Sequence, residues 1–268
     1  MGEALVTAAD AALRYEAGDW DAALAEVASL KEFLPPYGTA PAAWLPWQAY
    51  GLAALIAAHR GQGTTADALL AQLPEQAEPS DDAVRSRAGF ALAARTARAE
   101  QSGRMDVALD LLAAALVADI GQKQSWLPQL ARLALDAGRR DLLETAAQSA
   151  ETGVSDSAAE KALARHIRGL AQGDAELLAA AARSYKSASR RLDFGRVEED
   201  LAVLKAASGD PVNARRHLVR AVEAYVMLGA KAEMLRADTR LLRSGVSRSR
   251  RATTPDRRGG RGPGRLIP

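Results

Sequence analysis

The chain has no cysteine, so disulfide bonds and thiolate metal sites are excluded. It also lacks any run of about 18 apolar residues without a charge, and residues 1–10 contain no basic leader followed by an apolar core. We therefore expect neither a membrane span nor a signal peptide, with a cytoplasmic location as the default. No segment alternates apolar and polar residues as a half-buried strand does. The predicted fold class is all-α.

Side chains that form catalytic sites do not converge in the sequence. The three histidines, His59, His166 and His217, lie in different predicted helix pairs, and none belongs to a metal-binding spacing such as HExxH. We interpret His166 and His217 as surface or boundary residues. The consecutive carboxylates at 198–200 point apart on a helix, so we interpret them as a solvated face. We expect no enzyme activity, no metal and no cofactor.

What the sequence does contain is a repeat. Five glycines, each following an Ala- and Leu-rich segment, are spaced 35, 35, 36 and 36 residues apart: Gly103, Gly138, Gly173, Gly209 and Gly245. This is the period of a helix-pair array, and each glycine offers the left-handed conformation that ends a helix. The clearest helix start is Asp210-Pro211, an N-cap acceptor followed by a proline at the first helical position.

The apolar periodicity predicts about thirteen helices. In chain order they cover residues 3–17, 19–34, 41–59, 65–73, 80–100, 104–118, 122–137, 140–151, 156–171, 175–189, 191–208, 211–228 and 231–243. Alanine-rich pairs bury little area alone, so neighbouring pairs must share one continuous core. Six residues are expected to supply the bulk between layers: Trp126, Leu127, Leu130, Phe194, Val197 and Leu201. We predict a tetratricopeptide-like superhelix over residues 1–245, regular from 104 to 245.

Residues 246–268 differ in character. Seven of the 35 basic residues and one of the 33 acidic residues lie there, so the tail is net +6 and the preceding body net −4. Such an Arg/Gly/Pro-rich segment cannot bury enough apolar surface to fold, so we predict a disordered tail. It is either a linker or a weak, sequence-independent contact for nucleic acid, with attraction but no aromatic stacking. The candidate contact residues are Arg248, Arg250, Arg251, Arg257 and Arg258.

Aromatic side chains mark a candidate ligand groove. Trp44, Trp47 and Tyr50 recur at intervals of three residues, and Tyr185 lies on a later helix. One interpretation places these rings in a groove for a ligand or peptide. The other places the first three in the core under the proline loop at 35–40, and Tyr185 behind neighbouring apolar residues.

The final third resembles the closing helical repeats of the large, ATP-binding, MalT-like LuxR-family transcriptional regulators of actinobacteria. The stretches that carry the resemblance are Arg190-Arg191-Leu192, Asp193-Phe194-Gly195, Ala206-Ala207-Ser208-Gly209-Asp210, Ala214-Arg215-Arg216-His217-Leu218, Ala221-Val222 and Leu228-Gly229-Ala230. Those near the end, Arg236-Ala237, Leu241-Leu242, Gly245-Val246 and 248–251, resemble the segment before that family's helix-turn-helix. Leu45-Pro46-Trp47 resembles a short patch of the same helical region. The resemblance is best over about the last 75 residues.

The resemblance implies a sensor array between a P-loop ATPase and a DNA-reading helix-turn-helix. This chain has neither a Walker motif nor, beyond Arg251, an apolar helix-turn-helix pattern. ATP hydrolysis and specific DNA reading are therefore not assigned to any residue. We expect a truncated or diverged member whose array binds a protein segment or a small inducer. The alternative from another class is a stand-alone protein–protein interaction scaffold, with the tail as a tether.

Overall fold

The computed structural model describes residues 2–30, 44–73, 82–152 and 157–245, and all regular structure in these ranges is α-helical. The helices are α1 Gly2–Ala17, α2 Trp20–Leu30, α3 Trp44–His59, α4 Gly63–Leu70, α5 Asp82–Arg85, α6 Gly89–Gln101, α7 Met105–Val117, α8 Lys123–Asp136, α9 Arg140–Thr152, α10 Ala158–Gln172, α11 Ala175–Ser187, α12 Arg191–Ala207, α13 Pro211–Leu228 and α14 Lys231–Arg243. The predicted all-α helical-repeat superhelix is confirmed. The predicted disordered tail and the loop at 35–40 lie outside the described residues.

The local signals act as the sequence predicts. All five repeat glycines have positive φ, between 64° and 77°. Glycine adopts this backbone conformation without steric strain because it has no Cβ. Asp174 and Asp210 cap α11 and α13 by accepting hydrogen bonds from backbone N–H groups, those of Glu176 and Leu177 for Asp174 and that of Asn213 for Asp210. The predicted bounds of the last two helices, 211–228 and 231–243, match α13 and α14.

One predicted helix is interrupted. The range 80–100 was expected to be continuous, but α5 ends at Arg85 and α6 begins at Gly89. At the break the backbone N–H of Gly121 donates to the carbonyl of Arg85. A Cβ on Gly89 would lie 2.4 Å from the carbonyl oxygen of Gly121. The chain therefore leaves the helix because the loop after α7 packs directly against it.

One continuous apolar core runs through the array, as stacked repeats require. Of the six residues predicted to supply its bulk, five are buried and Phe194 is partly buried against them. Alanine is the commonest residue at the remaining buried positions, which allows the helices to approach closely. One close approach of two helix backbones involves Gly51 on α3, whose missing Cβ would lie 2.7 Å from the backbone nitrogen of Ala91 on α6.

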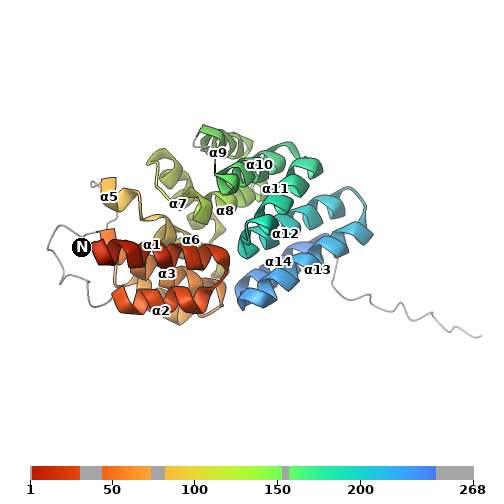
Figure 1. The fold of residues 1–268 in the computed structure, drawn as a ribbon. Coiled ribbons are helices and arrows are strands. Elements are labelled where there is room, and N and C mark those ends of the chain that lie inside the picture. The colour runs from red at the N-terminus through yellow and green to blue at the C-terminus, as the bar shows by residue number, and fades with distance from the viewer. Residues whose placement is uncertain (1, 31–43, 74–81, 153–156, 246–268) are drawn as a thin grey trace, which may run out of the picture.

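The superhelix closes on itself, which the repeat alone did not indicate. Figure 1 shows the first helices, α1–α3 in red and orange, beside the last pair, α13 and α14 in blue, with α7–α11 arching above them. Contacts join α3 to α14 and α1 to α12. At this seam the Leu228 side chain lies against Gly18 and the start of α14 lies against Gly61. The array therefore surrounds an interior instead of presenting an open concave face.

We predict that Gly51→Ala destabilises the protein by roughly 1–3 kcal/mol, because the added methyl group meets the backbone of α6, which cannot move aside without separating the two helices. Urea unfolding followed by circular dichroism measures the change. Gly2→Ala is the control, since nothing lies within 4 Å of its added Cβ. Equal stability of the two variants would contradict the close packing of α3 on α6.

Candidate functional site

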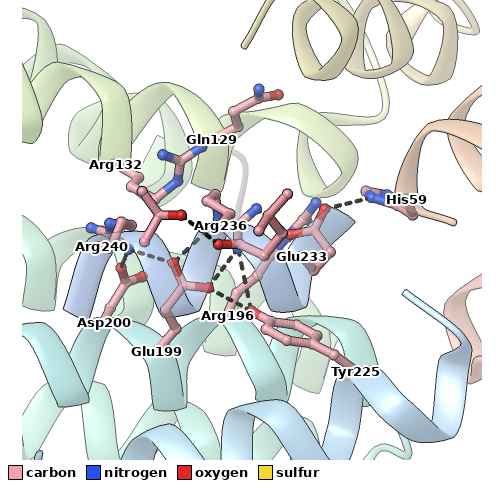
Figure 2. A network of polar contacts seen from close by, with 12 residues as sticks. His59, Gln129, Arg132, Arg196, Glu199, Asp200, Tyr225, Glu233, Arg236 and Arg240 are labelled. Carbon is pink, nitrogen blue, oxygen red and sulfur yellow. Dashed lines mark hydrogen bonds and ion pairs between the residues drawn. The ribbon is translucent and has the colours of Figure 1, made fainter. Parts of the chain in front are cut away.

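The interior of the closed array holds a network of charged side chains, drawn in Figure 2. Its last helix, α14, contributes Glu233, Arg236 and Arg240. The spacings of three and four residues place them on one face of the helix. These side chains point at α12 and at the helices of the first half of the chain. The helix that ends the array thus supplies one wall of its interior.

Glu199 on α12 lies at the centre of this network. It is fully buried and accepts hydrogen bonds from the Tyr225 hydroxyl at 2.9 Å, from Arg236 at 2.7 Å and from Arg240 at 2.8 Å. Burial pushes the pKa of Glu199 upward, but the two guanidinium groups outweigh it and hold that pKa below its ordinary value. The carboxylate therefore stays ionised and binds α12, α13 and α14 together.

Asp200, next to Glu199, extends the network to the middle of the array. Its carboxylate lies 2.9 Å from Nε2 of His166 on α10 and 3.0 Å from Arg240. Burial opposes ionisation of Asp200, while the His166 hydrogen bond and the Arg240 charge lower its pKa well below the ordinary value. Arg240 also reaches Asp136 on α8 at 3.4 Å. One arginine of α14 thus joins α12 and α8.

A second chain of contacts crosses the seam. His59 on α3 lies with Nδ1 2.6 Å from Glu233 and with Nε2 3.2 Å from the hydroxyl of Tyr15 on α1. The order hydroxyl, imidazole, carboxylate is that of a nucleophilic triad. Burial, however, raises the Tyr15 pKa far above its ordinary value, so this hydroxyl is not an activated nucleophile. We interpret the three residues as a structural link between α1, α3 and α14.

The opposite side of the interior has its own link. Arg190 pairs with Glu16 of α1 at 2.8 Å and with Asp193 of α12 at 2.7 Å. Across the middle, Glu100 of α6 accepts hydrogen bonds from Gln129 at 2.9 Å and Arg132 at 2.5 Å, both on α8. Charged pairs therefore connect helices around most of the interior.

Two of the cavities in the described part of the chain border the charged network, and both are partly open to the surface. The first, of about 420 Å³, is bounded by α1, α6, the loop before α8, α9, α10 and the start of α12. The second, of about 380 Å³, lies between α14 and the helices α3, α6, α8 and α12. Ser125 and Arg196 line both cavities, so the cavities adjoin at these two residues. We call them the α1 cavity and the α14 cavity.

The α14 cavity contains polar atoms with unused hydrogen-bonding capacity. Among the described residues, Nδ1 of His166 and Oε1 of Glu100 are buried without a partner, although the other polar atom of each side chain is engaged. Buried polar atoms without a partner are uncommon in folded proteins. The five acidic side chains lining this cavity are balanced by five arginines. Such a cavity suits a small polar molecule.

The aromatic residues predicted to form a groove lie elsewhere. Trp47 is buried, Trp44 and Tyr50 are partly buried, and arginine side chains stack on Trp44 and Trp47. Tyr185 is only 2% exposed and packs edge-on against His166. None of the four lines either interior cavity. As a ligand groove they stay a prediction, as do the tail contacts Arg248, Arg250, Arg251, Arg257 and Arg258, which lie outside the described residues.

Two predictions from the sequence were wrong. His166 was expected at the surface or a boundary but is 1% exposed, while His217 does lie at a boundary. The carboxylates at 198–200 were interpreted as a solvated face, yet all three are buried and paired. The sequence did contain a signal for this pairing: α14 repeats arginine on one face, and α12 carries three consecutive acids that can balance those charges.

In the described part of the chain no helix is both long and apolar enough to cross a membrane. Nor do these ranges contain a group of three or more His, Asp or Glu side chains placed to hold a metal ion. Comparison with protein-family models, with curated proteins and with solved structures finds no match to this chain.

Removing the charge at the centre should be costly. We predict that Glu199→Gln lowers the free energy of unfolding by about 3–5 kcal/mol, because Arg236 and Arg240 keep their buried charges without the carboxylate that balances them. Glu144→Gln removes an ion pair to Arg168 from a side chain that is 49% exposed, and should change stability by less than about 1 kcal/mol. Urea unfolding of both variants measures the difference, and similar losses would show that the network is not structurally important.

Acid should lower the free energy of unfolding through His59, which joins α3 to Glu233 of α14. Burial, followed by the charges of Arg196 and Arg236, lowers the His59 pKa below its ordinary value of 6.5 even though Glu233 and its hydrogen bond raise it. A proton therefore binds His59 more tightly in the unfolded chain, so stability is full above pH 6.5 and falls as the pH drops below it. We expect His59→Gln to flatten this fall between pH 7.5 and 5, measured by urea unfolding at each pH. His217→Gln is the control, and an unchanged slope in His59→Gln would refute the assignment.

Proposed function

We propose that this chain is a small-molecule sensor array, whose ligand binds in the α14 cavity between the last helix and the body. The observation that carries the proposal is that α14 occupies the interior. A ten-residue helix has a volume on the order of 1,200 Å³ from its diameter and rise. The α14 cavity measures about 380 Å³, within the usual range for small-molecule sites and too small for a bound helix. Between the two ligands predicted from the sequence, a small inducer is favoured over a protein segment.

The position of the cavity supports a sensing role. Its walls are formed by α14 on one side and by α3, α6, α8 and α12 on the other. A ligand that contacts both sides stabilises the docked position of α14 by its binding free energy. In the proposed family relationship to LuxR-type regulators, which rests on the resemblance of the final third, this is the helix that leads toward the DNA-reading domain. DNA binding, transcription regulation and a cytoplasmic location belong to the proposal on that ground alone.

The alternative, a stand-alone scaffold, is favoured by a different surface. On α13, Val212, Val219 and Val226 are exposed and recur every seven residues, so they lie along one side of the helix. This row lies apart from the interior cavities, which α13 does not line. A partner that docks on this row of α13 therefore makes no contact with the lining of the α14 cavity.

A matched pair of variants tests the proposal. Thr239 lines the α14 cavity from α14, and Thr145 lies exposed on α9; each hydroxyl donates to the carbonyl four residues earlier. Thermal unfolding is measured with a defined panel of amino acids, hydroxy and dicarboxylic acids, sugar phosphates, polyols, nucleosides and polyamines. We expect at least one compound, at about a hundred times its Kd, to raise the Tm of the wild type and Thr145→Trp by roughly 5–10 °C. Thr239→Trp should lose this shift, because the indole fills the cavity.

No shift with any compound, or an equal shift in Thr239→Trp, would refute the sensor proposal. Both variants must unfold cooperatively without ligand for the comparison to hold, and circular dichroism checks this. Because both positions are exposed on helices and lose the same type of hydrogen bond, a general effect of the substitution appears in both.

A further inference from the structure

Arg196 lies where the two interior cavities adjoin. It projects from α12 into the network of Figure 2 and, with Ser125, lines both interior cavities. Its side chain is 11% exposed. A guanidinium group carries five N–H donors and remains charged at any physiological pH. In such a position its donors need acceptors from the protein, from water or from a ligand.

Apart from Arg243, which is exposed, the other arginines that line the interior have close carboxylate partners. Arg132 lies 2.5 Å from Glu100, Arg190 lies 2.7 Å from Asp193, Arg236 lies 2.7 Å from Glu199 and Arg240 lies 2.8 Å from the same carboxylate. Within the described ranges the only ion pair of Arg196 is with Oδ1 of Asp193, at 3.8 Å. That separation exceeds the length of a hydrogen bond. Arg196 therefore differs from its neighbours in lacking a bonded acceptor in this part of the chain.

The carboxylates near Arg196 are already engaged. Asp193 accepts a hydrogen bond from Arg190, and Glu233 accepts from His59 and Arg236. Burial lowers the pKa of Arg196, but the negative charges of the Glu233 and Asp193 carboxylates outweigh this and raise it. These groups keep Arg196 charged without occupying its donors. The fork of the guanidinium remains available toward the cavities.

We propose that Arg196 binds the oxyanion group, a carboxylate or a phosphate, of the small ligand that occupies the α14 cavity. This rests on the proposed sensor function and specifies its ligand as a small organic anion. A planar guanidinium holds such a group through two parallel N–H···O bonds, a geometry that a lysine ammonium does not reproduce. Because Arg196 also lines the α1 cavity, the anionic end of the ligand lies where the cavities adjoin and the rest extends toward α14.

Citrate and inorganic phosphate serve as the probes, each titrated into the full chain by calorimetry at constant ionic strength, with sodium chloride as the reference. We expect at least one of them to bind the wild type, and Arg196→Lys to weaken that binding about tenfold or more while keeping the positive charge beside Glu233 and Asp193. Arg220→Lys is the control, because Arg220 is 56% exposed and lines neither cavity. Binding of citrate alone identifies a carboxylate, and binding of phosphate alone identifies a phosphate.

A second measurement uses only the wild-type protein, so a folding defect in Arg196→Lys cannot affect its result. In protein labelled with ¹⁵N-arginine, the Nε–H resonance of Arg196, assigned through its bonds, should shift on adding the probe that binds, while that of Arg220 should not. Binding of neither probe, equal binding by Arg196→Lys, or an unmoved Arg196 resonance would each overturn the assignment. If neutral or cationic compounds bind in a Thr239-dependent manner while both anions fail, the sensor proposal survives and this inference does not. If nothing binds, both are refuted.

Discussion

The balance of charge around Glu199 is the constraint on which the rest of the interior depends. A fully buried carboxylate is stable only with partners that compensate for lost hydration, and here those partners come from α13 and α14. Their side chains reach Glu199 only when α14 lies across the interior. The same arginines pair with Glu233, Asp200 and Asp136, so the position of α14 is determined by several carboxylates at once. Glu199 is the most buried of these carboxylates, and with the others it holds the last helix in place.

The placement of α14 changes what the array can bind. An open helical superhelix offers a long concave face suited to a peptide or a helix. Here, in the described part of the chain, the last helix covers that face and borders the α14 cavity of about 380 Å³, which adjoins the α1 cavity of about 420 Å³. The interior is rich in paired charges, with Arg196 at the junction of the cavities. This arrangement is the basis on which we propose a small anion, held by Arg196 among engaged carboxylates, as the ligand.

Individual elements show which features of the fold could be predicted from the sequence. Asp210, Pro211 and the repeat glycines specify helix ends through contacts within a few residues, and α13 and α14 match the predicted ranges. The break between α5 and α6 was missed because it depends on the backbone of Gly121, far along the chain. His166 and the acids of α12 were misplaced for a similar reason. Whether a charged residue is exposed depends on the element that packs over it, which local periodicity does not reveal.

By itself, the sequence determined the fold class, the repeat and most helix bounds, because each follows from short-range periodicity and capping. It also identified five of the buried residues that give the apolar core its bulk. Only the tertiary structure decided that the array closes and encloses a charged interior. Closure accumulates from small rotations between successive repeats, each set by side-chain packing, so no single segment encodes it. The clearest result of closure is the contact of His59 with Glu233, which are 174 residues apart in the sequence. Such contacts form only when all the intervening repeats are packed.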